Sequence, residues 1–250
     1  MGRVYFRAVA HQSCIEFVRN SLGAQDVSGR SLIEVGAANI NGSARDYLES
    51  LRPAQYVGVD IETGPGVDVI CDAQKLVSRF GPETFDIVVS TEMLEHVMDW
   101  RSAINNLKSI LRPGGVAVLT TRSIGFPLHA HPFDFWRFEQ ADMEDIFRDF
   151  EEIEVKKDPD PERPGVFVKV IKPLNKYRDP VDLSTIRLYS IIWHRKVGKI
   201  SPFGFRSVQF AWSAWRKANF LLPVSVRRRI ARSAGAAWAL DPESTRPRAR

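Results

Sequence analysis

The chain of 250 residues has only two cysteines, Cys14 and Cys71. Two thiols cannot build a disulfide framework or a zinc knuckle, so we expect free cysteines, a reducing compartment and a cytoplasmic protein. The sequence also lacks a run of 18 apolar residues, which indicates that no helix spans a membrane. A basic-then-apolar signal pattern is missing from the N-terminus, and no internal repeat is present.

Acidic residues are nearly absent from the last quarter of the chain. Residues 187–250 hold 14 basic and 2 acidic residues, a balance of +12, whereas residues 1–186 hold 21 and 28, a balance of −7. Together they give the net charge of +5, and four of the six Trp also lie in the basic part. The excess of positive charge is therefore a property of the tail alone.

Short apolar runs rich in Val and Ile alternate with helical patterns through the central part of the chain. The runs are Ser31–Gly36, Tyr56–Ile61, Val67–Cys71, Phe85–Ser90, Val116–Thr121, Phe150–Val155 and Val166–Ile171. Continuous apolar strands between helices are typical of a sheet that is covered on both faces. The sequence therefore predicts an α/β fold, a doubly wound, mostly parallel seven-stranded Rossmann-like sheet.

Three parts of the chain differ in pattern. Residues 1–29 predict an N-terminal helix that packs on the core, and residues 30–173 predict the sheet domain. Residues 174–250 predict a basic, Trp-rich helical extension with a disordered end. Helical spacing of apolar residues in this extension begins at Val208.

The ends of the first three strands carry the residue types of a nucleotide site. Gly36 follows the first strand, Asp60 ends the second strand 24 residues later, and Asp72 follows the third. A glycine turn permits close approach of a ligand to the main chain, and an acid at the second strand end suits ribose hydroxyls. Parallel strands bring these positions to one edge, so the pattern indicates an adenosine-containing cofactor. An ordinary strand-to-helix turn is the alternative for Gly36.

Longer stretches resemble a known family. IEVGAANINGS, YVGVDI, CDA, FDIVVSTEMLEHVMD and LKSILRPGGVAVLTT, in that order, are similar to class I S-adenosylmethionine-dependent methyltransferases. The similarity covers about residues 30–172, and FDIVVSTEMLEHV and LRPGGVAVLTT are its most specific parts. The resemblance implies S-adenosylmethionine as the cofactor.

The same resemblance implies cofactor contacts at the strand ends. The residues concerned are Glu34, Gly36, Ala37, Asn41, Asp60, Ile61, Asp72, Ala73, Ser90, Thr91 and Glu92. Glu34 would face the methionine moiety, Asp60 the ribose and Asp72 the adenine, while the segment after the fourth strand, with His96, would line the methyl-transfer site. The chain departs from the family at Ala38 and Ile40, where further glycines are usual, so its turn is bulkier.

A loop after the fifth strand, Gly125–Phe138, combines histidines, charges and aromatic rings. The spacing H-x-x-P-x-D-aromatic-x-R-F resembles methyltransferases of glycan biosynthesis, and aromatic faces suit a sugar ring. We expect His129 or His131 to act as general base for an acceptor hydroxyl, with His96 as a further candidate. Acceptor contacts are predicted at Phe126, Asp134, Trp136 and Arg137.

Purely structural roles are the alternative for the polar residues of this loop. Asp134 and Arg137 could form a structural ion pair, and each histidine could pack or cap a helix. His129, His131 and Asp134 could also supply metal ligands, although their spacing matches no recognised metal motif, so no metal is predicted.

Other functional classes compete with methyl transfer to a hydroxyl of a sugar, glycan or related small metabolite. A nicotinamide-dependent oxidoreductase would share Gly36 and Asp60 but needs a Tyr-x-x-x-Lys pair that is absent, and a non-catalytic binding protein would keep the fold alone. Nucleic acid is disfavoured as a substrate because Ser90-Thr-Glu-Met replaces the Pro-Pro-aromatic element of such enzymes. The oligomeric state is left open.

The tail has three interpretations. Trp212 and Trp215, with Arg227–Arg229, would suit an anionic membrane surface such as the inner face of a cell membrane. The same arginines could contact nucleic-acid phosphates. Alternatively the tail is a helical subdomain packed on the acidic part of the chain.

Overall fold

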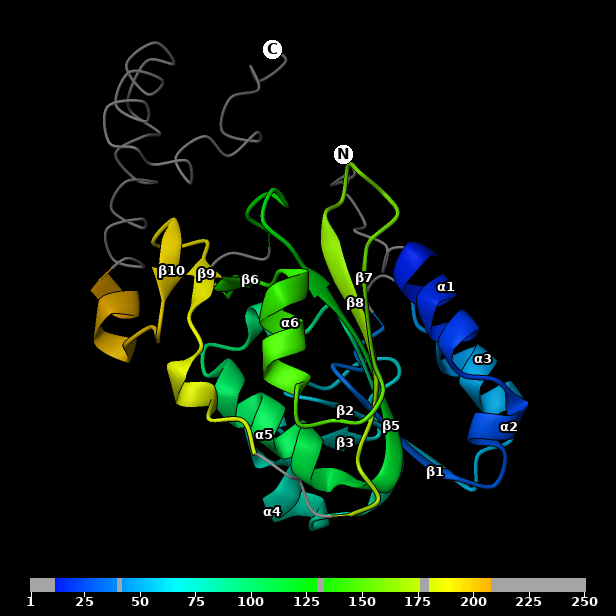
Figure 1. The fold of residues 1–250 in the computed structure, drawn as a ribbon. Helices are drawn as coiled ribbons and strands as arrows, with labels where there is room; N and C mark the ends of the chain where they lie inside the picture. Colours follow the sequence, from blue (N-terminus) through cyan, green and yellow to red (C-terminus); the bar gives the residue numbers. More distant parts are fainter. Residues whose placement is uncertain (1–11, 40–41, 130–132, 176–179, 208–250) are drawn as a thin grey trace.

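The fold was analysed in a computed structural model that describes residues 12–39, 42–129, 133–175 and 180–207 (Figure 1). Its α-helices are α1 (Gln12–Ser21), α2 (Ala24–Val27), α3 (Arg45–Ser50), α4 (Leu76–Phe80), α5 (Trp100–Ile110) and α6 (Gln140–Phe147). Its short 3-10 helices are η1 (Ala73–Lys75), η2 (Leu94–His96) and η3 (Leu183–Thr185). Within these described residues, no helix is both long and apolar enough to cross a membrane.

The strands form one large sheet and one small one. They are β1 (Ser31–Val35), β2 (Gln55–Asp60), β3 (Val69–Ile70), β4 (Phe85–Thr91), β5 (Leu111–Arg122), β6 (Trp136–Arg137), β7 (Ile153–Lys157), β8 (Gly165–Ile171), β9 (Leu188–Ser190) and β10 (Arg195–Val197). The large sheet has the order β3-β2-β1-β4-β5-β8-β7, and only β8 runs against its neighbours. The predicted mostly parallel seven-stranded sheet is confirmed.

Apolar side chains leave both faces of this sheet. In β1, Leu32 joins the buried cluster under α1, α2 and α3, whereas Ile33 joins the cluster under α4, α5 and α6. In β4, Val89 and Val88 divide between the same two clusters. Successive strand residues point to opposite faces, so a continuous apolar run buries both. Figure 1 shows the two groups of helices on opposite sides of the sheet.

The N-terminal helix packs on the sheet from Gln12 onward, and residues 1–11 of its predicted range lie outside the described part. Cys14 and Phe17 are buried against this face, where Phe17 meets the Phe167 ring at 5.1 Å between centroids. Burial raises the pKa of the Cys14 thiol far above its usual range. Cys14 and Cys71 are both free thiols, as predicted.

The small antiparallel sheet, ordered β10-β9-β6, was not anticipated. Its strands have two or three residues each, too few for a periodic sequence pattern. Through it the start of the C-terminal extension packs on the main body, because Leu188, Ile200 and Phe205 are buried in the same apolar cluster as Trp136. The helices predicted from Val208 onward lie outside the described residues.

Candidate functional site

The carboxyl ends of the parallel strands surround a cavity of about 580 Å³. Its wall includes Gly36, Ala38, Asp60, Ile61, Asp72, Ala73, Thr91, Glu92, Met93, His96 and Phe133. Seven of these are predicted cofactor contacts and His96 is a predicted catalytic residue, so the sheet edge brings them together as expected. A volume of this size is typical of small-molecule and cofactor sites.

Gly36 makes the turn at this cavity possible. Its φ is +84°, a left-handed conformation that side chains disfavour. An added Cβ would also lie 2.7 Å from Cβ of Met93, a contact that real side chains do not make. The residue is therefore required to be glycine by backbone geometry and by the close approach of the η2 segment. The bulkier residue Ala38 in this turn does not change the requirement for glycine at position 36. Asn41, another predicted cofactor contact, lies outside the described residues.

Two carboxylates mark the cavity wall at successive strand ends. Oδ2 of Asp60 accepts a hydrogen bond from the Ala38 amide at 3.2 Å, and Oδ1 accepts one from the Glu62 amide at 3.3 Å. Asp72 caps η1 by accepting from the Gln74 amide at 2.9 Å. Among the described residues, each carboxylate oxygen of Asp60 accepts only one long hydrogen bond, and Asp60 lines the cavity. Both oxygens can therefore still accept hydrogen bonds from the hydroxyls of a ligand.

An apolar side chain lies beside these acids. Ile61 is 66% exposed although it lines the cavity wall. An exposed branched side chain at the rim of a cavity offers a surface for a flat ring. This is the place where the resemblance puts the adenosine.

Glu34 lies behind the cavity wall. Its side chain is almost completely buried, accepts a short hydrogen bond from the Tyr56 hydroxyl, and lies 3.4 Å from Oγ of Ser43. Burial raises the pKa of Glu34 to about 6, and the bonds from Tyr56 and Ser43 oppose that rise. Glu34 therefore braces the strand-to-helix turn from within. Ala37 and Ser90, two further predicted contacts, are also buried.

Glu92 turns the chain sharply at the end of β4. Its φ of +53° is left-handed, an unfavourable conformation for a residue with a side chain. The Arg122 guanidinium donates to its carboxylate, and burial together with the charge of Glu95 raises the pKa of Glu92. This turn leads directly into η2, which carries His96 to the cavity.

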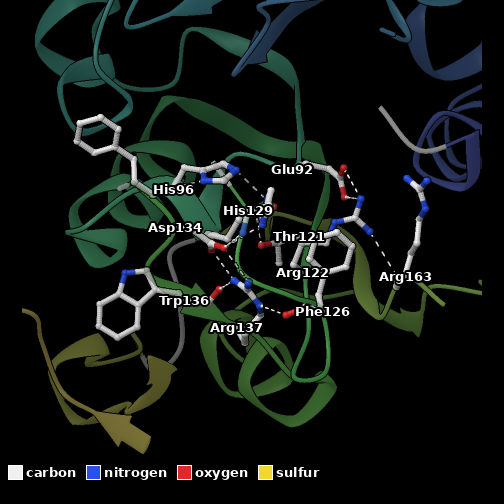
Figure 2. A network of polar contacts seen from close by, with 12 residues as sticks. Glu92, His96, Thr121, Arg122, Phe126, His129, Asp134, Trp136, Arg137 and Arg163 are labelled. Atoms are coloured by element: carbon white, nitrogen blue, oxygen red, sulfur yellow. Dashed lines mark hydrogen bonds and ion pairs between the residues drawn. The ribbon is translucent and has the colours of Figure 1, made fainter. Parts of the chain in front are cut away.

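His129 and Asp134 are held together in the loop after β5 (Figure 2). Nδ1 of His129 lies 2.9 Å from Oδ2 of Asp134, which also accepts the His129 main-chain amide at 2.8 Å. Arg137 donates to both carboxylate oxygens of Asp134 and to the Pro127 carbonyl at 2.9 Å. The Arg137 and His129 partners hold the pKa of Asp134 well below its usual range.

The predicted acceptor contacts are therefore mostly internal. Asp134, Trp136 and Arg137 are at most 1% exposed, and Nε1 of Trp136 donates to the Val97 carbonyl at 3.0 Å. Their role in this structure is to fix the loop, the ion-pair interpretation that the sequence left open. Phe126 is half-buried and packs its ring 5.0 Å from that of His129.

The two described candidate bases lie next to each other although 33 residues separate them. The rings of His96 and His129 are 4.7 Å apart between centroids. His131 lies outside the described residues, so the metal set of His129, His131 and Asp134 is not tested. Within the described part, Arg137 donates to both carboxylate oxygens of Asp134. His129 of the loop after β5 therefore contacts His96, and His96 lines the cavity.

Sequence reasoning missed a carboxylate in this cluster. Glu95 is completely buried, and its Oε2 accepts a hydrogen bond from the Thr121 hydroxyl at 2.7 Å. Its Oε1 lies 3.9 Å from Nε2 of both His96 and His129. The available sequence signal was the acidic residue directly before His96. Its partner Thr121 lies on β5, which the local sequence around Glu95 does not reveal.

Comparison with known proteins places the chain among methyltransferases. A family model described as a methyltransferase domain matches residues 6–149. A ubiquinone biosynthesis O-methyltransferase from Parvibaculum lavamentivorans is 30% identical over 102 residues, which are 41% of this chain and 38% of that protein. A phthiotriol/phenolphthiotriol dimycocerosates methyltransferase from Mycobacterium tuberculosis is 29% identical over 102 residues, 36% of this chain and 37% of that protein. The chain thus matches less than half the length of these relatives.

Solved structures share the fold. A Burkholderia thailandensis 1,6-didemethyltoxoflavin-N1-methyltransferase superposes with a TM-score of 0.54 at 17% identity, covering 66% of this chain and 79% of that one. The magnesium protoporphyrin IX methyltransferase of Synechocystis PCC 6803 gives 0.52 at 15% identity, covering 69% and 90%. At such identities the similarity establishes the Rossmann-like methyltransferase fold.

Proposed function

The chain belongs to the methyltransferase domain family, whose model matches more than half of its length, and on that premise we propose that it transfers a methyl group from S-adenosylmethionine to an acceptor hydroxyl. The observation that carries the proposal is the cavity at the carboxyl edge, where the Gly36 turn and the Asp60 carboxylate lie on one wall. Relatives named as O-methyltransferases support oxygen as the accepting atom.

The residues of the cavity fit this cofactor by their chemistry. Asp60 offers carboxylate oxygens for the two ribose hydroxyls, and Ile61 offers an apolar face for the adenine. Gly36 lines the same wall and has no side chain that would cover its main-chain atoms. When bound, S-adenosylmethionine supplies an electrophilic methyl group on a positively charged sulfur. The carboxylates of Asp60, Asp72 and Glu92 line the same cavity and favour a cation.

Methyl transfer to a hydroxyl requires removal of one proton. The bound cofactor would supply the methyl group and keep the electron pair of the broken carbon–sulfur bond on sulfur, so the chain's own residues need only take up the acceptor proton. His129 suits the role of base because its Nδ1 lies 2.9 Å from the Asp134 carboxylate, which favours the tautomer whose Nε2 lone pair can take the acceptor proton. Arg137 acts as a positioning residue, since it holds Asp134 and the Pro127 carbonyl.

For the acceptor we retain a sugar, glycan or related small metabolite. Phe126 beside His129 and the half-exposed Phe133 at the cavity rim provide the aromatic surfaces that such a ring requires. The names of the relatives point to a second class, intermediates of ubiquinone biosynthesis, in which the accepting atom is again an oxygen. Both classes present an oxygen nucleophile to the same base.

A radiolabelled methyl-transfer assay tests the proposal. The full chain is incubated with S-adenosylmethionine that carries a labelled methyl group and with separate pools of sugars, nucleotide sugars and polyprenylated phenols. Label should appear in one pool with release of S-adenosylhomocysteine, and His129→Ala should reduce that signal at least about 100-fold. Binding of S-adenosylmethionine without transfer to any oxygen acceptor, together with transfer to an amine pool, would overturn the assignment to hydroxyls.

A further inference from the structure

Three side chains with metal-binding atoms converge beside the cavity. Glu95 and His96 come from η2, and His129 comes from the loop after β5. Figure 2 shows His96 and His129 next to each other, although their two segments are distant in sequence. Their ligand atoms all lie within 4.8 Å of one another. Oε1 of Glu95 is 3.9 Å from Nε2 of each histidine. The sequence pattern grouped His96 and His129 as candidate bases and gave no role to Glu95.

The surroundings leave one ligand atom free on each side chain. Nδ1 of His96 lies 2.7 Å from the Phe133 carbonyl, which can only accept, so this nitrogen carries the proton and Nε2 keeps its lone pair. Nδ1 of His129 faces the ionised Asp134 at 2.9 Å, which gives His129 the same tautomer. Oε2 of Glu95 is engaged by Thr121, and Oε1 is left over.

One carboxylate oxygen of Glu95 also points to a cation, for a reason that does not depend on the histidines. Glu95 is completely buried, yet Oε1 has no hydrogen-bond partner among the described residues. A buried carboxylate oxygen without a partner is costly, since it has lost its hydration without compensation. A cation that contacts this oxygen would remove that cost.

The second ring nitrogen of each histidine also has the kind of partner that metal-binding histidines use. Histidine ligands almost always donate their second ring N–H to a carboxylate or a backbone carbonyl. His129 has the Asp134 carboxylate, itself fixed by Arg137, and His96 has the Phe133 carbonyl. Ligands about 2.1 Å from one ion are roughly 3.0 to 3.5 Å apart, so the observed separations close with side-chain shifts below about 1 Å.

We propose that Glu95, His96 and His129 hold a divalent first-row transition metal ion, with zinc as the best match to two imidazoles and one carboxylate. His96 lines the cavity and is about a quarter exposed, so a coordination position remains open toward the acceptor. The inference rests on the proposed function for its purpose: a coordinated acceptor hydroxyl releases its proton to bulk water more easily. In the metal-loaded chain His129 is then a ligand, whereas in the metal-free chain it is the direct base.

Metal titration of the tag-free, chelator-treated full chain tests the site. Cobalt is added first, because its visible absorption reports coordination by nitrogen and oxygen, and zinc then competes for the same position. We expect one equivalent per chain for the wild type. Glu95→Gln and His129→Asn, which alter ligands from different segments, should each weaken binding at least about 10-fold. Zinc should raise the melting temperature of the wild type and not that of either variant.

His194→Asn is the matched control. His194 lies on the β9–β10 turn with a φ of +49°, a conformation that Asn tolerates, and it should leave the stoichiometry at one. The proposal is overturned if the wild type binds no cobalt or zinc above the level of unspecific surface binding, or if both ligand variants bind like the wild type. Calorimetry with S-adenosylmethionine in chelator is independent of this site, so a failed metal titration and a failed proposed function are distinguishable.

Discussion

Asp134 and Arg137 form a buried ion pair in which the guanidinium contacts both carboxylate oxygens. The same guanidinium reaches the carbonyls of Phe126 at 3.2 Å and Pro127 at 2.9 Å. The pair therefore ties both ends of the loop that carries His129. Since His129 contacts the same carboxylate, the orientation of the proposed base depends on an interaction that solvent does not reach.

Removal of one partner should destabilise the fold strongly. Arg137→Met leaves the Asp134 charge buried without its main partner, and we expect the free energy of unfolding to fall by about 3 to 5 kcal/mol. Urea unfolding followed by circular dichroism measures the change. The double variant Asp134→Leu/Arg137→Met should lose less than the single variant. A loss below about 1 kcal/mol for Arg137→Met would contradict a buried pair.

Glu34 should make stability depend on pH. Its folded pKa is raised to about 6 from 4.5, so the unfolded chain ionises first as pH rises. The contribution of Glu34 to the free energy of unfolding is fully present below pH 4.5 and is lost as pH rises through about 6. In total it amounts to about 2 kcal/mol. Glu34→Gln removes this titration. The difference in unfolding free energy between wild type and variant should therefore change across this window, and parallel pH profiles would contradict the assignment.

Asp60 should control cofactor affinity. Loss of hydrogen bonds to a charged acceptor costs about 1.5 to 3 kcal/mol, so Asp60→Ala should weaken S-adenosylmethionine binding about 10- to 100-fold. Asp145→Ala is the control, because Asp145 is an exposed acid on α6 away from the cavity. Calorimetry on both variants decides the matter. Equal affinity of Asp60→Ala and wild type would rule out the ribose contact.

His129 should act on turnover more than on binding. With His129→Ala we expect kcat to fall at least about 100-fold while the affinity for S-adenosylmethionine stays within about twofold. His131→Ala and the double variant complete the series, since both histidines were candidate bases. Unchanged turnover in all three variants would show that neither histidine of this loop is the general base.

A truncation that tests the basic tail should keep its buried first part, which ends at Phe205 among the described residues. Truncation after residue 186 would remove Leu188, Ile200 and Phe205 from the buried cluster, at about 1.5 to 3 kcal/mol each, so we expect that fragment not to fold. A 1–207 chain keeps them. Under the membrane interpretation of the tail, flotation with vesicles rich in anionic lipid recovers the full chain and not the 1–207 chain. Equal flotation of both chains would exclude that interpretation and favour a subdomain packed on the core.

Much of the fold could be predicted because burial on both faces leaves a strong signal. The run Phe85–Ser90 is continuous and apolar since Val88 and Val89 serve opposite clusters. Gly36, Asp60 and Asp72 could be placed at one edge because parallel strands must end there. These positions depend on strand direction and chain order, which the sequence carries.

The remaining parts depend on contacts between distant segments. Glu95 acquires its partner Thr121 from β5, and nothing local marks that pairing. Trp136 was expected at the acceptor, yet its indole N–H is satisfied by the Val97 carbonyl and its ring is buried. An aromatic residue suits a sugar site and a core equally well, so composition could not decide between them.

Calorimetry with S-adenosylmethionine, S-adenosylhomocysteine and NAD on the full chain distinguishes a methyltransferase cofactor site from a dinucleotide site. We expect saturable binding of S-adenosylmethionine and S-adenosylhomocysteine at one site per chain, lost together in Asp60→Ala and retained in Asp145→Ala. Binding of NAD with no response to either sulfur-containing ligand would contradict it.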